Sequence, residues 1–458
     1  MHFDVPKPSM KQRAIFLFYH GFGHINAFLK PARILEENNY EVWFGGAGFF
    51  RDYVVAQGFK FYLLKSYPFG VGLEKWINTV EKKNVVYFRT LWDRITDKVF
   101  SDRQVDLYWM LEDLKPTLVF VDRMQSTDFL TLYPQLKDRS INTAIVNTML
   151  PTQITVDRPP LNSDVLPTDS RGIFKAIRKS KWNRLKKKWK QKLTSFGFDD
   201  TYIIARSIQK NPIPKQYLSL NEDLLNLNLE HVPELILAPK EFDFPFSTLQ
   251  ANQSYVGFLT MAERVDLTRK VIDDKLTSIL KTKQEKRLKL IYCSFGTVPP
   301  KQQQTITTFF QKLATIAAGG EFMFLISAAS NALISNTAEN FYIFETLPQI
   351  DILKQADVFI THGGLNSIKE AICTEVPMLV YPVHPEYDPR GNAARIFYHK
   401  LGLRGSIASD TVDDIKSKIR ELLSNNDYRQ NICKLKNADN DYNAIGFMNA
   451  IMAIKPLS

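Results

Sequence analysis

The sequence predicts an α/β protein with two doubly wound domains, each built on a parallel β-sheet covered by helices. Short apolar runs with polar or glycine borders recur in both halves of the chain, and they have the length of buried parallel strands. Most gaps between these runs have the hydrophobic spacing of helices. A chain of 458 residues, 45% apolar and 23% charged, is long enough for two such domains.

The first half opens with a strand, a glycine turn and a helix. The run AIFLFYH at residues 14–20 predicts the strand, and residues 28–35 continue with helical spacing. EVWFGG predicts a second strand, and two more buried strands are expected in TLVFVD at 117–122 and NTAIVNT at 142–148. These elements predict one α/β domain.

The second half repeats this architecture after an irregular stretch. Residues 150–250 contain nine prolines, and we expect loops and helices there rather than sheet. A new series of strands starts at LKLIYCSFG, residues 288–296, and continues with EFMFLISA, FYIFETL, DVFITHG and PMLVYPV.

Several classes of protein are disfavoured by composition. The chain has no run of about 18 apolar residues, and its first thirteen residues lack the apolar core of a secretory signal, so we expect a cytoplasmic protein without a membrane span. Cys293, Cys373 and Cys433 are too few and too scattered for a metal cage or a disulfide framework, and we expect them to be reduced. The lone Asp-x-Asp, at residues 439–441, is expected to be a solvated surface or helix-start cluster.

The net charge of +11 is concentrated in one segment. Residues 170–198 hold eleven Lys or Arg and no acidic residue, which leaves the remainder neutral. A protein that binds nucleic acid would also carry a recognisable binding module, and none is evident. We therefore expect no nucleic-acid partner.

The segment FITHGGLNSIKEAICTEVP, residues 359–377, predicts a phosphate site where a strand turns into a helix. The unpaired N–H groups of a helix start bind phosphate, and His362 and the Ser367 hydroxyl can add donors. Glu370 follows about one turn later, where a carboxylate can accept hydrogen bonds from sugar hydroxyls. This combination predicts a nucleotide diphosphate with a ribose, and hence a nucleotide-sugar.

The stretch ETLPQIDILKQADVFITHGGLNSIKEAICTEVPMLVYP resembles the donor-binding signature of family 1 glycosyltransferases, the UDP-glycosyltransferase superfamily that includes bacterial macrolide and carotenoid glycosyltransferases. The matching elements, in the family's order, are Pro348-Gln349, His362-Gly363-Gly364, Asn366-Ser367, Glu370-Ala371, Val376-Pro377, Pro382 and Asn392-Ala393. The resemblance implies the GT-B fold, in which two Rossmann-like domains, residues 1–254 and 255–437, face a cleft. It also implies that a helix within residues 438–458 returns to the first domain.

The resemblance assigns most of the donor site. It places His362 and Ser367 at the phosphates, Asn366 at the phosphate or sugar region, and Glu370 at the ribose hydroxyls. The residues that match the family's strand-end loop near the diphosphate are Ser294, Gly296 and Thr297.

Two departures from the family pattern concern the base and the sugar. Many members have a Trp that stacks on uracil before the Pro-Gln pair, whereas this chain has Thr346 and Leu347, which leaves the identity of the base open. The segment HPEYDPRGN is two residues longer than usual and lacks the usual Gln. Glu386 or Asp388, with Tyr387 between them, is therefore expected at the sugar hydroxyls.

Two residues of the first half are candidates for catalysis. His24, in GFGHINAF, matches the family's catalytic base, and Asp122, at the end of LKPTLVFVD, matches the carboxylate that orients this base. The alternative for Asp122 is a helix N-cap or a solvated acid at a strand end. His20 competes with His24, and we interpret it as an ordinary strand-end residue.

The same glycine turn also begins a dinucleotide-binding pattern. Gly21 and Gly23 fit G-x-G-x-x-G, but Asn26 occupies the place of the third glycine, and EVWFGG ends in glycine instead of the acid that would hold a ribose. An NAD-dependent oxidoreductase is therefore the weaker interpretation.

Within residues 171–196, an apolar stripe follows helical spacing. Its members are Trp182, Leu185, Trp189, Leu193 and Phe196, and lysines flank it. One hypothesis is attachment to an anionic membrane surface, on the inner face of the membrane, with a lipophilic acceptor. In the alternative, the stripe packs on the first domain while lysine stems cover it.

These inferences predict an inverting, metal-independent glycosyltransferase that moves a sugar from a nucleotide diphosphate, in the first instance a UDP-sugar, to a hydroxyl of a small lipophilic acceptor. The nucleotide-sugar is a co-substrate, and no other cofactor is expected. Alternatives are a nucleotide-sugar epimerase of similar build and a membrane-surface binding protein with a vestigial nucleotide site. The acceptor stays open among carotenoid, polyketide, sterol or lipid-like compounds and flavonoid-like phenols.

Overall fold

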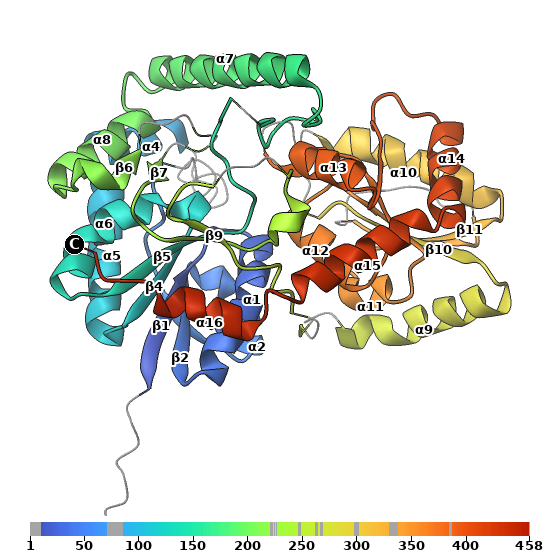
Figure 1. Ribbon diagram of the computed structural model, residues 1–458, viewed down its shortest axis with the longest axis horizontal. Coiled ribbons are helices and arrows are strands. Elements are labelled where there is room, and N and C mark those ends of the chain that lie inside the picture. The colour runs from blue at the N-terminus through green and yellow to red at the C-terminus, as the bar shows by residue number, and fades with distance from the viewer. Residues whose placement is uncertain are drawn as a thin grey trace, which may run out of the picture.

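The structure is a computed structural model, and its elements form two α/β halves (Figure 1). The described residues are 11–70, 86–156, 158–219, 223, 225, 227–245, 249–261, 264–265, 269–296, 302–328, 338–383 and 387–457.

The first half is built on a seven-stranded sheet in which all neighbouring strands are parallel. In sheet order the strands are β3 (Lys60–Leu63), β2 (Tyr40–Gly46), β1 (Gln12–Leu17), β4 (Leu118–Asp122), β5 (Asn142–Asn147), β8 (Glu234–Ile236) and β9 (Gln253–Tyr255). The helices of this half are α1 (Phe22–Glu37), α2 (Arg51–Ala56), α4 (Val86–Ile95), α5 (Lys98–Leu114), α6 (Thr127–Asp138), α7 (Ser170–Thr194) and α8 (Asp200–Lys210). Strands β1, β4 and β5 are almost wholly buried, because helices cover both faces of the sheet.

The second half has a six-stranded sheet that is also parallel throughout. In sheet order the strands are β12 (Phe341–Phe344), β11 (Phe322–Ser327), β10 (Lys289–Ser294), β13 (Val358–Thr361), β14 (Met378–Val380) and β15 (Gly402–Arg404). The remaining helices are α9 (Arg269–Glu285), α10 (Gln303–Ala318), α11 (Gln349–Leu353), α12 (Leu365–Cys373), α13 (Pro389–Tyr398), α14 (Val412–Ser424), α15 (Asp427–Asp439) and α16 (Ala444–Met452). In both sheets the strand order reverses at one point, between β1 and β4 and between β10 and β13. Such switch points open a crevice at the carboxyl ends of the strands.

The prediction that residues 150–250 contain no sheet was wrong. Strand β8 pairs with β5 and extends the first sheet, and the two-residue strands β6 (Leu218–Ser219) and β7 (Asn228–Leu229) form an antiparallel pair. These strands are two or three residues long, and Pro233 directly precedes β8. Segments this short carry too few alternating positions for a periodic signal.

The chain returns to the first half at its end. Helix α16 packs beside α1, and Phe447 and Ile451 share a hydrophobic cluster with Phe28 and Leu35. This helix begins at Ala444 rather than near residue 438, because α15 ends at Asp439. Since the Asp439 carboxylate accepts a hydrogen bond from the backbone of Phe258 at 2.7 Å, the expectation of a solvated Asp-x-Asp was wrong for Asp439.

A buried ion pair joins the two halves. Arg395 of α13 donates through Nε to Oδ1 of Asp243 at 2.8 Å, and both side chains are at most 2% exposed. The hydroxyl of Tyr255 donates to the other oxygen of Asp243 at 2.6 Å. Burial alone would raise the pKa of Asp243, but the charges of Arg395 and Arg158 and the hydrogen bonds from Tyr255 and Arg395 together outweigh it, and the pKa lies below its usual range.

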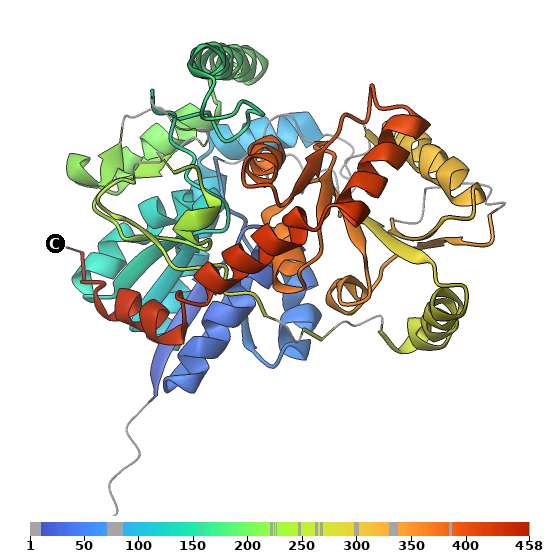
Figure 2. The same ribbon diagram turned by 45° about the vertical axis from the view of Figure 1, so that its right-hand side comes forward.

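Helix α7 lies at the periphery, outside both sheets, in both views (Figures 1 and 2). Trp182, Trp189 and Leu193 are 55%, 59% and 71% exposed. The alternative in which the stripe packs on the first domain was therefore wrong. Among the described residues, no helix combines the length and the apolar character needed to cross a bilayer. The three cysteines are free, and Cys293 is buried.

Candidate active site

The first switch point brings His24 and Asp122 together. Strands β1 and β4 run side by side, with Leu17 paired to Val121, so the residues that follow both strands lie at the same edge of the sheet. Helix α1 starts at Phe22, which places His24 in its first turn. His24 Nδ1 lies 2.7 Å from Asp122 Oδ2.

Asp122 is fully buried behind the imidazole. Its other oxygen accepts a hydrogen bond from the backbone of Met124 at 2.8 Å, so the carboxylate is held from two sides. Thr148, at the carboxyl end of β5, places Oγ1 at 3.1 Å from the same ring nitrogen of His24. Because Nδ1 faces the carboxylate, Nε2 is the ring nitrogen available to a ligand.

The surroundings of His24 favour its protonated form. Burial by itself lowers its pKa, but the charge of Asp122 and the hydrogen bond to it outweigh burial, and the pKa is raised above 6.5. The charge of Asp388, which comes from the second half of the chain, acts in the same direction.

His20 has different surroundings. Its ring lies among Phe49, Phe50 and Tyr67, and burial, reinforced by the charge of Arg103, lowers its pKa to about 3. His20 is therefore neutral near pH 7, and His24 makes the contact with Asp122.

The opposite wall is the turn between β13 and α12. Gly363 has φ of +92°, and a Cβ there would lie 2.9 Å from the Pro389 carbonyl, so this position requires glycine. A Cβ on Gly364 would lie 2.6 Å from Nε2 of His362, so its absence makes room for the imidazole. The free N–H groups of the α12 N-terminus follow directly.

The two walls enclose a cleft of about 630 Å3. His24 lies on one side, and the predicted donor residues that line it are Gly296, Thr346, Leu347, Gln349, His362, Gly364, Asn366, Ser367, Glu370, Tyr387 and Asp388. Ser294 and Gly363 do not line the cleft; Ser294 is 7% exposed, at the end of β10. Thr297 and Glu386 lie outside the described residues.

Both carboxylate oxygens of Glu370 have partners. Arg264 Nη1 donates to Oε1 at 2.9 Å, and Gln349 Nε2 donates to Oε2 at 2.6 Å. Gln349 Nε2 also lies 3.2 Å from the hydroxyl of Ser367. An ionised carboxylate offers about four acceptor positions, so lone pairs remain for sugar hydroxyls.

Asn366 and Asn392 connect the elements around the cleft. The amide of Asn366 donates to the backbone oxygen of Gly23, across from α12 to the first half. Asn392 Nδ2 donates to the Gly363 carbonyl at 2.9 Å and to Asp388 Oδ2 at 2.7 Å. Burial raises the pKa of Asp388, and the hydrogen bond from Asn392 partly offsets this effect.

Sequence reasoning missed Thr148, Arg264 and Tyr292, which contact the dyad or line the cleft. Thr148 could have been found, because it ends a predicted strand at the edge that also carries His24 and Asp122. Arg264 lies in the connection between the sheets, outside any helix or strand, and no pattern marks it.

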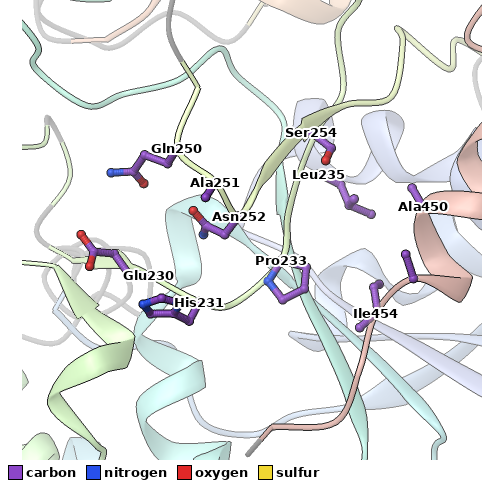
Figure 3. A pocket seen from close by; sticks show the side chains of 11 residues that line it. Glu230, His231, Pro233, Leu235, Gln250, Ala251, Asn252, Ser254, Ala450 and Ile454 are labelled. Atoms are coloured by element: carbon purple, nitrogen blue, oxygen red, sulfur yellow. The ribbon is translucent and has the colours of Figure 1, made fainter.

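A second cavity, of about 640 Å3, lies at the β9 edge of the first sheet. Figure 3 shows Leu235 of β8, Ser254 of β9 and Ala450 of α16 around it. Its described lining contains none of the predicted site residues, so the chemistry gathers in the cleft between the halves.

Sequence comparison relates part of the chain to known proteins. Residues 231–451 match the family model for UDP-glucoronosyl and UDP-glucosyl transferase. An uncharacterized UDP-glucosyltransferase of Bacillus subtilis (strain 168) is 34% identical over 155 residues, which cover 33% of this chain and 38% of the Bacillus protein. UDP-glucuronosyltransferase 1A8 of Rattus norvegicus is 34% identical over 109 residues, 23% of this chain and 20% of the rat protein. The chain thus aligns with well under half the length of these relatives.

Solved structures match nearly the whole chain. The glycosyltransferase of kitacinnamycin has a TM-score of 0.66 at 16% identity and covers 97% of this chain and 98% of its own. The calicheamicin glycosyltransferase CalG4 has a TM-score of 0.62 at 15% identity, with the same coverage. These likenesses show the fold, and they confirm the predicted GT-B class.

Proposed function

Because residues 231–451 match the family model for UDP-glucoronosyl and UDP-glucosyl transferase, we propose that the chain is an inverting, metal-independent glycosyltransferase. It moves a sugar from a nucleotide diphosphate, in the first instance UDP, to a hydroxyl of a small lipophilic acceptor. The nucleotide-sugar is a co-substrate, and no further cofactor is assigned.

One observation carries the proposal. The imidazole of His24, held by Asp122 at 2.7 Å, shares a cleft with the N-terminus of α12 and with Glu370. A base and a phosphate site on opposite walls are what in-line transfer needs, since the acceptor and the leaving group take opposite faces of the sugar.

In the proposed reaction, His24 Nε2 takes the proton of the acceptor hydroxyl as the acceptor oxygen bonds to the anomeric carbon. The bond from that carbon to the diphosphate oxygen breaks from the opposite face, so the configuration inverts. Asp122 stabilises the imidazolium as the proton arrives. The amides at the start of α12 and His362 stabilise the charge on the departing diphosphate, so no metal ion is assigned to this task.

The other cleft residues bind the donor. Ser367 adds a hydroxyl at the phosphates, and Glu370, held by Gln349 and Arg264, accepts from the ribose hydroxyls. For the transferred sugar we propose Asp388, with Tyr387 beside it. The further donor contacts proposed from the resemblance are Gly296, Thr346, Leu347, Gly364 and Asn366, with Ser294 and Gly363 supporting the walls, and Thr297 and Glu386 outside the described residues.

Apolar side chains in the cleft support the proposal that the acceptor is lipophilic. Tyr19, Phe22, Met124 and Met149 line the cleft on the His24 side, and Phe22 is 51% exposed. An exposed aromatic ring at a cleft supplies apolar contact area for a ligand.

The proposed location is cytoplasmic, with peripheral attachment to the inner face of the membrane through residues 171–196.

The experiment is a thermal-shift panel of UDP-, dTDP- and GDP-sugars, followed by a transfer assay with the stabilising donor and a set of hydroxylated lipophilic acceptors. We expect UDP-sugars to raise Tm most and nucleotide diphosphate release to depend on the acceptor. Isomerised donor formed without acceptor would indicate the epimerase instead. Failure to bind, hydrolyse or transfer any donor would contradict the proposal and favour a surface-binding protein.

A further inference from the structure

One face of helix α7 contacts the rest of the protein. Ile173 is its one buried residue, Ser180 Oγ donates to Asn162 at 2.9 Å, and Arg184 donates to the backbone oxygen of Asp223. Ile173, Ser180 and Arg184 are seven and four residues apart, so they share one face of the helix. This face therefore seats α7 on the protein.

The opposite face carries the apolar stripe. Trp182 lies two residues before Arg184 and Trp189 five residues after it, about half a turn away in each case. The exposed fractions along the stripe, continued past the helix end, are 55% for Trp182, 46% for Leu185, 59% for Trp189, 71% for Leu193 and 73% for Phe196. The largest apolar side chains of α7 thus point away from the protein, whereas a helix of a soluble protein usually buries them.

Cations border the stripe. Residues 170–198 contain eleven Lys or Arg and no acid. A groove of about 790 Å3 on α7 is lined by six cationic side chains together with Trp182 and Leu185. Cationic groups beside aromatic and aliphatic ones complement a surface that is anionic outside and apolar beneath.

We propose that α7 is a docking helix for an anionic lipid bilayer. The stripe inserts at the boundary between headgroups and acyl chains, and the lysines at its borders lie at the lipid phosphates. Leu185 and Leu193 favour lipid over nucleic acid, because an exposed leucine offers a base neither a stacking face nor a hydrogen bond. This inference concerns binding alone and does not depend on glycosyl transfer.

The test is co-sedimentation of the full chain, without donor or acceptor, with vesicles of phosphatidylcholine alone or mixed with phosphatidylglycerol. We expect binding only to the anionic vesicles and release at high salt, since salt screens the attraction. Lys186→Gln with Lys190→Gln should lower the partition coefficient about fivefold for each charge removed. Trp182→Ser with Trp189→Ser should lower it at least as much.

Trp109→Ser is the matched control, because Trp109 of α5 is 56% exposed and lies outside α7. Trp109→Ser should bind the vesicles like the parent. His24→Ala should also bind like the parent, and this second variant separates failure of docking from failure of catalysis. Equal binding by the α7 variants and the parent would overturn the proposal. Absence of binding to the anionic vesicles at low salt would also overturn it. Salt-sensitive RNA binding in its place would indicate a nucleic-acid partner, and self-association that Trp182→Ser abolishes would indicate a second copy of the chain.

Discussion

His24 Nδ1 lies 2.7 Å from Oδ2 of Asp122, although the two residues are 98 positions apart in the chain. Neighbouring parallel strands, β1 and β4, end at the same edge of the first sheet and bring the pair together. With Asp122 fully buried, the imidazole is oriented from behind and presents Nε2 to the cleft.

Replacing the imidazole tests its role as the base. His24→Ala should lower kcat about 10²- to 10⁴-fold, the usual contribution of a positioned base, and leave the Kd for UDP nearly unchanged. Calorimetry with UDP and the transfer assay together measure both. His231→Ala, an exposed histidine at the second cavity, is the control and should retain full activity. Full activity of His24→Ala would remove His24 from the mechanism.

The pH profile should report the same histidine. A base must be neutral, and the pKa of His24 is raised above 6.5. The value of kcat/KM should therefore fall on the acidic side with a midpoint above 6.5. In Asp122→Asn the raising charge is lost while burial remains, so the midpoint should move to lower pH and kcat should drop. An unchanged midpoint in Asp122→Asn would contradict the assignment.

Glu370 is expected to hold the ribose. Glu370→Gln replaces an ionised acceptor by a neutral amide, and we expect the Kd for UDP to rise about tenfold, the loss of one charge-assisted hydrogen bond. Glu375→Gln provides the control, because this carboxylate is 42% exposed and does not line the cleft. Equal affinity in the two variants would place the ribose elsewhere.

The base site can be tested by adding an aromatic ring. Thr346 lines the cleft and offers no stacking face, so Thr346→Trp should lower the Kd for UDP about threefold to tenfold if the base lies there. UDP and GDP should be compared by calorimetry, since the ratio of their affinities reports the shape of this subsite. If Thr346→Trp weakens the binding of both UDP and GDP, the base must lie against another wall of the cleft.

The ion pair between the halves should support stability. Arg395→Leu leaves Asp243 buried without its cation, and we expect a loss of about 3 kcal/mol in the free energy of unfolding. Since the pKa of Asp243 is lowered in the folded state, its contribution is present above the unfolded value of 3.8 and is lost as pH falls through the lower, folded value. Denaturant unfolding at several pH values measures both effects.

The control for Arg395→Leu is Arg420→Leu, which breaks an exposed pair with Glu321 and should leave stability almost unchanged. If the two variants lose equal free energy of unfolding, burial of the pair between Arg395 and Asp243 adds nothing to stability.

The turn between β13 and α12, with the first residues of α12, was the most predictable part of the site. His362, Ser367 and Glu370 lie within nine residues, and the strand, turn and helix that carry them leave a local pattern. His24 follows strand β1 and Asp122 ends strand β4, far apart in the chain, so only the family resemblance linked them before the structure did. Neither a local pattern nor the resemblance identified Arg264, because its contact with Glu370 depends on how the connection between the sheets folds.

Two further features depended on tertiary packing. Helical spacing placed Trp182 and Trp189 on one face, but spacing alone cannot tell which neighbour, if any, covers that face. Strand β8 is three residues long, and it becomes a strand because β5 offers an open edge beside it. Local sequence carries neither kind of information.

The most direct test of the account is a crystal structure of the protein with UDP. We predict that diphosphate oxygens lie within hydrogen-bonding distance of His362 and the backbone amides at the start of α12, with Nε2 of His24 facing them across the cleft. A diphosphate bound away from this helix terminus, or a His24 ring turned out of the cleft, would contradict it.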